Sequence, residues 1–89
     1  MISVLVVDDS TFMRNTITAL LEQDSDIKIV GTARNGQEAL QKAEELDPDV
    51  MTLDVDLPRL DGLGVLQQLM KKTPLPVLMI SRSEERRVG

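Results

Sequence analysis

Four short apolar runs, separated by segments with helical spacing, constrain the fold of this chain more than any other feature of its sequence. Runs that are rich in β-branched residues are typical of strands covered on both faces. They occupy residues 2–7, 27–33 (interrupted by Gly31), 50–53 and 77–80. Because predicted strands and helices alternate with short connections, the sequence predicts an α/β fold with a doubly wound parallel sheet and right-handed crossovers.

The three segments between these runs have the apolar spacing of amphipathic helices. Asp8, Asp9 and Ser10 offer capping groups for the first helix, and Asn35 with Gly36 turns the chain into the second. The stripes expected to face the sheet are Met13, Ile17, Leu20 and Leu21, then Ala39, Leu40, Ala43 and Leu46, and finally Leu63, Leu66, Leu69 and Met70.

Composition excludes several classes of function. A net charge of −5 argues against a nucleic-acid surface, which needs a basic footprint. The absence of Cys and His excludes disulfides, thiolate zinc sites and an imidazole base. No apolar run approaches the roughly 20 residues that span a bilayer, and Asp8 and Asp9 interrupt the first run too early for a signal peptide. We therefore expect one cytoplasmic domain with no nucleic-acid or membrane partner.

Polar residues stand where three of the predicted strands end. Asp8 and Asp9 follow the first strand, Asp54 follows the third and Ser81 follows the fourth. In a doubly wound sheet the first and third strands are neighbours at the switch in strand order, so their carboxyl ends share one cleft. Crowded carboxylates repel each other unless a cation neutralises them, and Mg²⁺ prefers oxygen ligands. Taken alone, an acidic pair at this position is more often a helix cap, and a residue such as Ser81 is usually part of a turn. The placement of all these polar residues at the ends of successive strands indicates a functional site.

The acidic pair after the first strand, the stretch 53–62 (Leu-Asp-Val-Asp-Leu-Pro-Arg-Leu-Asp-Gly) and the strand ending at Ser81 resemble the receiver domain of two-component response regulators. The resemblance covers residues 2–81 and implies a flavodoxin-like fold. Relative to the family pattern, the fourth helix, the fifth strand with its Lys, and the fifth helix are missing. The expected fold is therefore incomplete, with three helices and four strands in the order 2-1-3-4.

The same resemblance implies a role for each matching residue. Asp54 would be the phosphoacceptor, and Ser81 would hydrogen-bond the phosphoryl oxygens and report phosphorylation. Asp9 would bind Mg²⁺ directly, Asp8 would assist through water, and Asp56 would contribute its backbone carbonyl. Pro58 and Gly62 would shape the loop. The phosphoryl donor would be a phosphohistidine on a partner histidine kinase. Phosphoryl transfer needs positioning and charge neutralisation more than it needs a general base.

Residues 8–14, 52–62 and 74–81 also look like the amino-terminal receiver of chemotaxis protein-glutamate methylesterases. In that family the receiver restrains a carboxy-terminal serine hydrolase. The catalytic His of such a hydrolase is absent from these residues. We therefore expect the chain itself not to be an enzyme and the methylesterase to belong to the parent protein.

Residues 82–89 read Arg-Ser-Glu-Glu-Arg-Arg-Val-Gly and depart abruptly from the family pattern. The charged start of a natural fourth helix is one interpretation. The sequencing adapter AGATCGGAAGAGCGTCGTGTAGGG, however, encodes these residues codon for codon. We expect a partial receiver domain over residues 1–81 and an artefactual tail over residues 82–89.

Other functions remain open at this point. A haloacid-dehalogenase-like phosphatase would use Asp54 as nucleophile and Asp56 as acid/base, but Pro58 and the upstream position of the acidic pair fit it poorly. A Toprim-like domain lacks its Glu at the first strand and a basic surface. A receiver joined to a different output domain is the third alternative.

Overall fold

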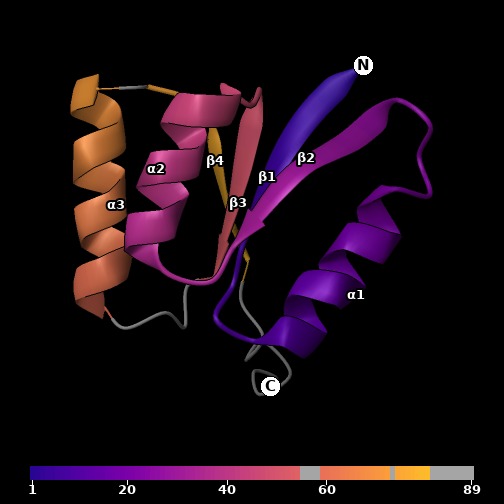
Figure 1. Ribbon diagram of the computed structural model, residues 1–89, viewed down its shortest axis with the longest axis horizontal. Coiled ribbons are helices and arrows are strands. Elements are labelled where there is room, and N and C mark those ends of the chain that lie inside the picture. Colours follow the sequence, from indigo (N-terminus) through magenta and orange to yellow (C-terminus); the bar gives the residue numbers. More distant parts are fainter. Residues whose placement is uncertain (55–58, 73, 81–89) are drawn as a thin grey trace, which may run out of the picture.

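Strands and helices alternate along the chain in the computed structural model, which describes residues 1–54, 59–72 and 74–80. The four strands form one parallel sheet in the order β2-β1-β3-β4 (Figure 1), as the sequence predicts. The elements are β1 (Ile2–Val7), α1 (Thr11–Leu21), β2 (Ile27–Ala33), α2 (Gly36–Leu46), β3 (Val50–Asp54), α3 (Arg59–Lys72) and β4 (Val77–Ile80).

The helices lie on both faces of the sheet, with α1 on one side and α2 and α3 on the other (Figure 1). Successive side chains of a strand point to opposite faces. Accordingly Val4 and Val6 pack with Ile17 of α1. The buried side chains on the opposite face are Leu5, Val7, Ala33, Ala39, Ala43, Met51, Leu53 and Leu69. Side chains that alternate along β1 therefore lie at the centre of two apolar layers, one on each face of the sheet.

Two expected boundaries differ from the structure. β3 continues through Asp54, one residue beyond the apolar run, so the carboxylate belongs to the last position of the strand. α3 begins at Arg59 and includes Gly62, which we expected in the preceding loop. Glycine weakens a helix by only about 1 kcal/mol relative to alanine, so one glycine does not prevent the helix from extending through it. Pro58 lies outside the described residues.

Three members of the expected apolar stripes are exposed. Leu20 of α1 is 60% exposed, Met70 of α3 is 54% exposed and Leu46 at the end of α2 is 39% exposed, whereas Ile17 and Leu69 are buried. A helical stripe is buried only as far as neighbouring elements cover it. Among the described elements α1 is the one helix on its face of the sheet, which leaves the outer edge of its stripe in solvent. The side chains of Leu63 and Leu66 lie outside the described residues.

Gly31 does not break β2 but follows a β-bulge within it. The pairing with β1 changes register between Val4, opposite Ile29, and Leu5, opposite Gly31. A bulge inserts one extra residue and bends the strand, and glycine often accompanies such a close approach. A Cβ at Gly31 would lie 2.7 Å from Leu46 Cδ1, so α2 packs closely over this point.

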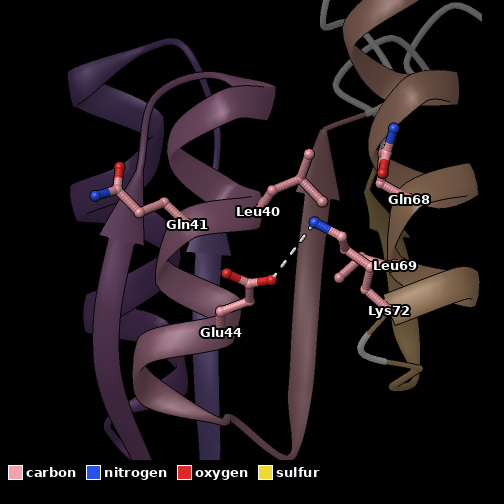
Figure 2. Close-up of a pocket in the computed structure, with 6 residues that line it drawn as sticks. All are labelled: Leu40, Gln41, Glu44, Gln68, Leu69 and Lys72. Atoms are coloured by element: carbon pink, nitrogen blue, oxygen red, sulfur yellow. Dashed lines mark ion pairs between the residues drawn. The ribbon is translucent and has the colours of Figure 1, made fainter.

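A small pocket lies between α2 and α3 (Figure 2). It has a volume of about 100 Å³, and Lys72 Nζ lies 3.9 Å from Glu44 Oε2 at its side. Pockets for small ligands usually enclose about 300–1,000 Å³. This gap is therefore a feature of helix packing. None of the helices in the described part of the chain has the length and apolarity needed to cross a bilayer.

Ser3 and Asp49 join the amino ends of β1 and β3. Asp49 Oδ2 accepts hydrogen bonds from the Ser3 backbone N–H at 2.8 Å and from the Ser3 hydroxyl at 3.0 Å. The Asp49 N–H donates back to Ser3 Oγ at 2.9 Å. The backbone and then the side-chain hydrogen bonds from Ser3 lower the pKa of Asp49. Hydrogen bonds to the charged form favour that form.

This pair predicts a pH-dependent contribution to stability. Because the folded pKa is below the ordinary value of 3.8, the contribution is present above that value and is lost as the pH falls through the folded pKa. Asp49→Asn should therefore destabilise the protein at neutral pH, and the difference from the parent should shrink in acid. Chemical unfolding across a pH series measures this. Ser3→Ala, which keeps the backbone donor, should show a smaller difference; a constant gap for Asp49→Asn at every pH would contradict the assignment.

Candidate functional site

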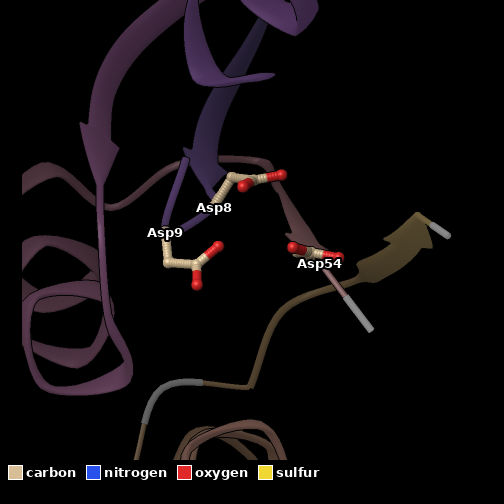
Figure 3. A group of neighbouring side chains, drawn as sticks. All are labelled: Asp8, Asp9 and Asp54. Carbon is tan, nitrogen blue, oxygen red and sulfur yellow. The ribbon is translucent and has the colours of Figure 1, made fainter. Parts of the chain in front are cut away.

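Three carboxylates converge at the carboxyl edge of the sheet. Asp8 and Asp9 follow β1, and Asp54 ends β3 (Figure 3). One carboxylate oxygen from each residue lies within 4.8 Å of the others. Asp8 and Asp54 are buried, with 1% and 2% exposure, and Asp9 is exposed. The structure therefore brings together the three acidic residues that we expected to share a cleft.

The strands hold these residues in place. Val7 pairs with Ala33 of β2 and with Leu53 of β3. Asp8 therefore directly follows a strand that is hydrogen-bonded on both edges. The Asp8 N–H donates to the Ala33 carbonyl at 3.0 Å. Asp54 is itself in the ladder, opposite Ile80 of β4. Asp54 therefore sits on a strand and Asp8 directly follows one, an arrangement that favours a precise functional site.

The turn between β1 and α1 is ordered by its own polar groups. The Ser10 N–H donates to Asp8 Oδ1 at 2.9 Å, and Ser10 Oγ accepts from the Met13 N–H at 3.2 Å as the expected helix cap. Arg14 Nη1 donates to the Asp8 carbonyl at 2.8 Å and Nη2 donates to Thr11 Oγ1 at 3.0 Å. Arg14 was not among the site residues predicted from the sequence. The one feature of the sequence that could have indicated it is the presence of a cationic residue in the first turns of the helix that follows the acidic pair.

The arrangement of oxygens fits a hard divalent cation. Oxygens bound to one octahedral Mg²⁺ at about 2.1 Å lie about 3 Å apart when adjacent and about 4 Å apart when opposite. The observed limit of 4.8 Å among the three carboxylates is therefore close to what one shared ion requires. Carboxylate oxygens without sulfur or imidazole suit Mg²⁺, Mn²⁺ or Ca²⁺ rather than softer metals.

Two expected site residues lie outside the described residues, namely Asp56 and Ser81. Ser81 directly follows Ile80, the β4 partner of Asp54. Chemically, the described part of the site offers a buried carboxylate as a nucleophile, beside two further carboxylates that could hold a cation. Such a set suits transfer of an anionic group to Asp54, since the cation would offset the charge of both reactants.

Comparison with known proteins agrees with this geometry. A sequence model described as "Response regulator receiver domain" matches residues 4–88. The protein-glutamate methylesterase/protein-glutamine glutaminase of Halalkalibacterium halodurans is 56% identical over 80 residues, which is 90% of this chain and 23% of that protein. The protein of the same name from Symbiobacterium thermophilum is 58% identical over 80 residues, covering 90% of this chain and 22% of that one. The chain thus spans under a quarter of these curated relatives.

Solved structures show the same fold. The response regulator domain of Thermotoga maritima CheB superposes with a TM-score of 0.86 at 45% identity, over 100% of this chain and 66% of that chain. A chain in the crystal structure of the P1 domain of CheA3 in complex with CheY6 from R. sphaeroides gives 0.80 at 36% identity, over 90% of this chain and 63% of that one. With this sheet order, this acidic pocket and a match over most of its length, the chain belongs to the family of response regulator receiver domains.

Proposed function

We propose that Asp54 accepts a phosphoryl group from a phosphohistidine of a partner histidine kinase. The observation that carries the proposal is the placement of Asp54, buried at the end of β3, within 4.8 Å of Asp8 and Asp9. A carboxylate in this position can act as a nucleophile once its charge and that of the phosphoryl group are offset. In this scheme the site is a phosphorylation switch of a phosphorelay.

The transfer balances without a general base. An ionised Asp54 oxygen forms a bond to phosphorus as the phosphorus–nitrogen bond of the donor breaks, and the departing imidazole nitrogen keeps the electron pair. With acetyl phosphate as donor, a phosphorus–oxygen bond breaks and acetate leaves. The product in both cases is an acyl phosphate on Asp54. Because an ionised carboxylate has no proton to lose, the lack of His in the chain is no obstacle.

The other site residues have supporting roles in this proposal. Bound Mg²⁺ would neutralise charge on the phosphoryl oxygens and orient them for in-line transfer. Asp9 would bind the metal directly, Asp8 would assist through water, and Asp56 would offer its backbone carbonyl. Ser81 would donate its hydroxyl to a phosphoryl oxygen and so distinguish the phosphorylated state. The family match and the acidic cluster support these assignments.

The relatives suggest which kind of protein this receiver serves. The curated proteins at 56% and 58% identity are protein-glutamate methylesterases/protein-glutamine glutaminases. We infer that the receiver regulates an output domain of that type in a chemotaxis pathway, with a chemotaxis kinase as donor. The complex of the CheA3 P1 domain with CheY6 supports a partner of this kind.

We also propose that the receiver sequence ends at residue 81. The two curated matches span 80 residues each, while the family model extends to residue 88. An independent read of the gene past codon 81 tests whether residues 82–89 belong to it. Recovery of the same codons from genomic DNA would contradict an artefactual tail.

Acetyl phosphate labelling of the intact gene product tests the proposed function. Radiolabelled acetyl phosphate with Mg²⁺ should leave a stable label on the protein, and hydroxylamine should release it because acyl phosphates react with this nucleophile. A chelator should prevent labelling. Release of free phosphate with no retained label would favour the phosphatase alternative, and a label resistant to hydroxylamine would rule out a carboxylate as acceptor.

A further inference from the structure

Arg14 makes a bond that fixes the backbone between the two adjacent carboxylates. Its Nη1 donates to the Asp8 carbonyl at 2.8 Å, a contact that is partly buried. Its Nη2 donates to Thr11 Oγ1 at 3.0 Å, which anchors the other arm of the fork to the first turn of α1. A guanidinium with two partners is held in one orientation, and its hydrogen bonds are charge-assisted.

The bonded carbonyl belongs to the peptide unit that leads into Asp9. Because that unit is planar, a bond that fixes the Asp8 oxygen also fixes the direction of the Asp9 N–H and Cα. The Asp8 N–H is fixed separately by Ala33, and Asp8 Oδ1 by Ser10. Asp9 is the exposed member of the acidic cluster, outside the strand ladder. The Arg14 bond ties this peptide plane to a side chain of α1.

We propose that Arg14 is a positioning residue that sets the affinity of the site for Mg²⁺ by ordering the Asp8–Asp9 peptide. The inference rests on the proposed function, in which Asp9 binds the metal. When a ligand must be ordered at the moment of binding, the cost appears as weaker affinity. Groups that orient metal ligands without touching the metal typically change affinity by about 10–100-fold when they are replaced.

Charge and positioning predict opposite results for Arg14. As a nearby positive charge, the guanidinium would repel Mg²⁺, so its removal would tighten binding. As a residue that orients the Asp8–Asp9 peptide, Arg14 favours the geometry that binds Mg²⁺, so its removal weakens Mg²⁺ binding. The sign of the change in Mg²⁺ affinity therefore separates the two roles. Irreversible loss of folding would lower the stoichiometry of binding, whereas reversible unfolding would raise the apparent dissociation constant in proportion to the inverse of the folded fraction. Each variant is therefore titrated under conditions in which denaturant unfolding shows it to be fully folded.

The test is a calorimetric titration of the intact gene product with Mg²⁺ alone. The heat that disappears in Asp9→Ala defines binding at this site. Arg14→Met should raise the dissociation constant about tenfold at unchanged stoichiometry. Arg14→Lys, which keeps the charge and one donor group but loses the fork, should recover part of that loss. Mg²⁺-dependent labelling by acetyl phosphate should need correspondingly more Mg²⁺ for half its maximal rate, with a similar rate at saturation.

Arg34 provides the matched control. Its side chain is 69% exposed, pairs with Glu38 at 3.1 Å and directly follows Ala33, the β2 partner of the Asp8 N–H. Arg34→Met removes a positive charge from this edge without touching the Asp8 carbonyl, so Mg²⁺ affinity should stay the same or rise. Unchanged or tighter binding in Arg14→Met, or equal weakening in Arg34→Met, would overturn the role of Arg14. If the parent protein and Asp9→Ala gave the same heat on titration with Mg²⁺, the proposed metal site itself would be overturned.

Discussion

Asp54→Asn should abolish phosphorylation and at the same time stabilise the metal-free protein. The amide oxygen is a poor nucleophile and would form no stable acyl phosphate, so labelling by acetyl phosphate should fall by more than about a thousandfold. Asn has nearly the same shape as Asp, so the strand and its ladder should survive. The loss of label would therefore report on chemistry and not on folding.

The gain in stability follows from the crowding of carboxylates. Asp8 and Asp54 are both buried, and their ligand oxygens lie within 4.8 Å of each other. Two ionised groups at this separation repel by about 3 kcal/mol if the effective dielectric constant is about 20. Neutralising one of them should raise the free energy of unfolding by about 1–3 kcal/mol when no metal is bound, since part of the repulsion is relieved by solvent and neighbouring dipoles.

Denaturant unfolding of the intact gene product in chelator and in excess Mg²⁺ measures this effect. The parent should gain stability on addition of Mg²⁺, because a ligand that binds only the folded state stabilises it by mass action. Asp54→Asn should gain less, so the two proteins should converge. Leu53→Val, a neighbouring core substitution, should be destabilising in both conditions. If Asp54→Asn were less stable than the parent in chelator, the carboxylates would not be under the repulsion inferred from their spacing.

Asp9→Ala should cause the largest loss of Mg²⁺ binding among the acidic variants. In the proposed site Asp9 is a direct ligand, whereas groups that only orient ligands already account for about 10–100-fold in affinity. We therefore expect the Mg²⁺ dissociation constant to rise by more than about a hundredfold, with labelling lost at millimolar Mg²⁺. Calorimetric titration and the Mg²⁺ dependence of labelling measure these two effects.

Asp56→Ala is the control for Asp9→Ala. If Asp56 contributes only its backbone carbonyl, removal of its side chain should change the Mg²⁺ dissociation constant by no more than about twofold. Both variants remove one negative charge from the protein, so the difference between them isolates direct coordination by Asp9. Equal losses in Asp9→Ala and Asp56→Ala would show that net charge, rather than these particular ligands, governs metal binding.

Features with a local cause were predictable from the sequence. The apolar runs form the strands, and Ser10 caps α1 as expected. Asn35, expected in the turn before α2, is the cap of that helix. The carboxylates gather because parallel strands end at one edge of a sheet. Features that depend on neighbours were not predictable. Met70 has helical spacing with the core but lies exposed, because burial depends on what packs beside a helix.

The bond from Arg14 to the Asp8 carbonyl illustrates the same limit within the site. Sequence spacing places Arg14 on α1, but which carbonyl its guanidinium reaches depends on how the β1–α1 turn directs the helix. Backbone acceptors carry no signature in the sequence, since every residue has one. The bulge opposite Val4 and Leu5 was missed for a related reason, because register is a property of two strands together.

The central position of β1 also bears on how the chain folds while it is being synthesised. β1 is made before β2 and β3, which pair with its two edges, so its hydrogen bonds are complete only after β3 has left the ribosome. Until then at least one edge of this apolar strand is open, and an open edge is the usual template for aggregation. Asp8 and Asp9 place two charges directly beside it, as gatekeeper residues do for strands of this kind. We therefore expect these two carboxylates to limit aggregation of the nascent strand in addition to lining the site.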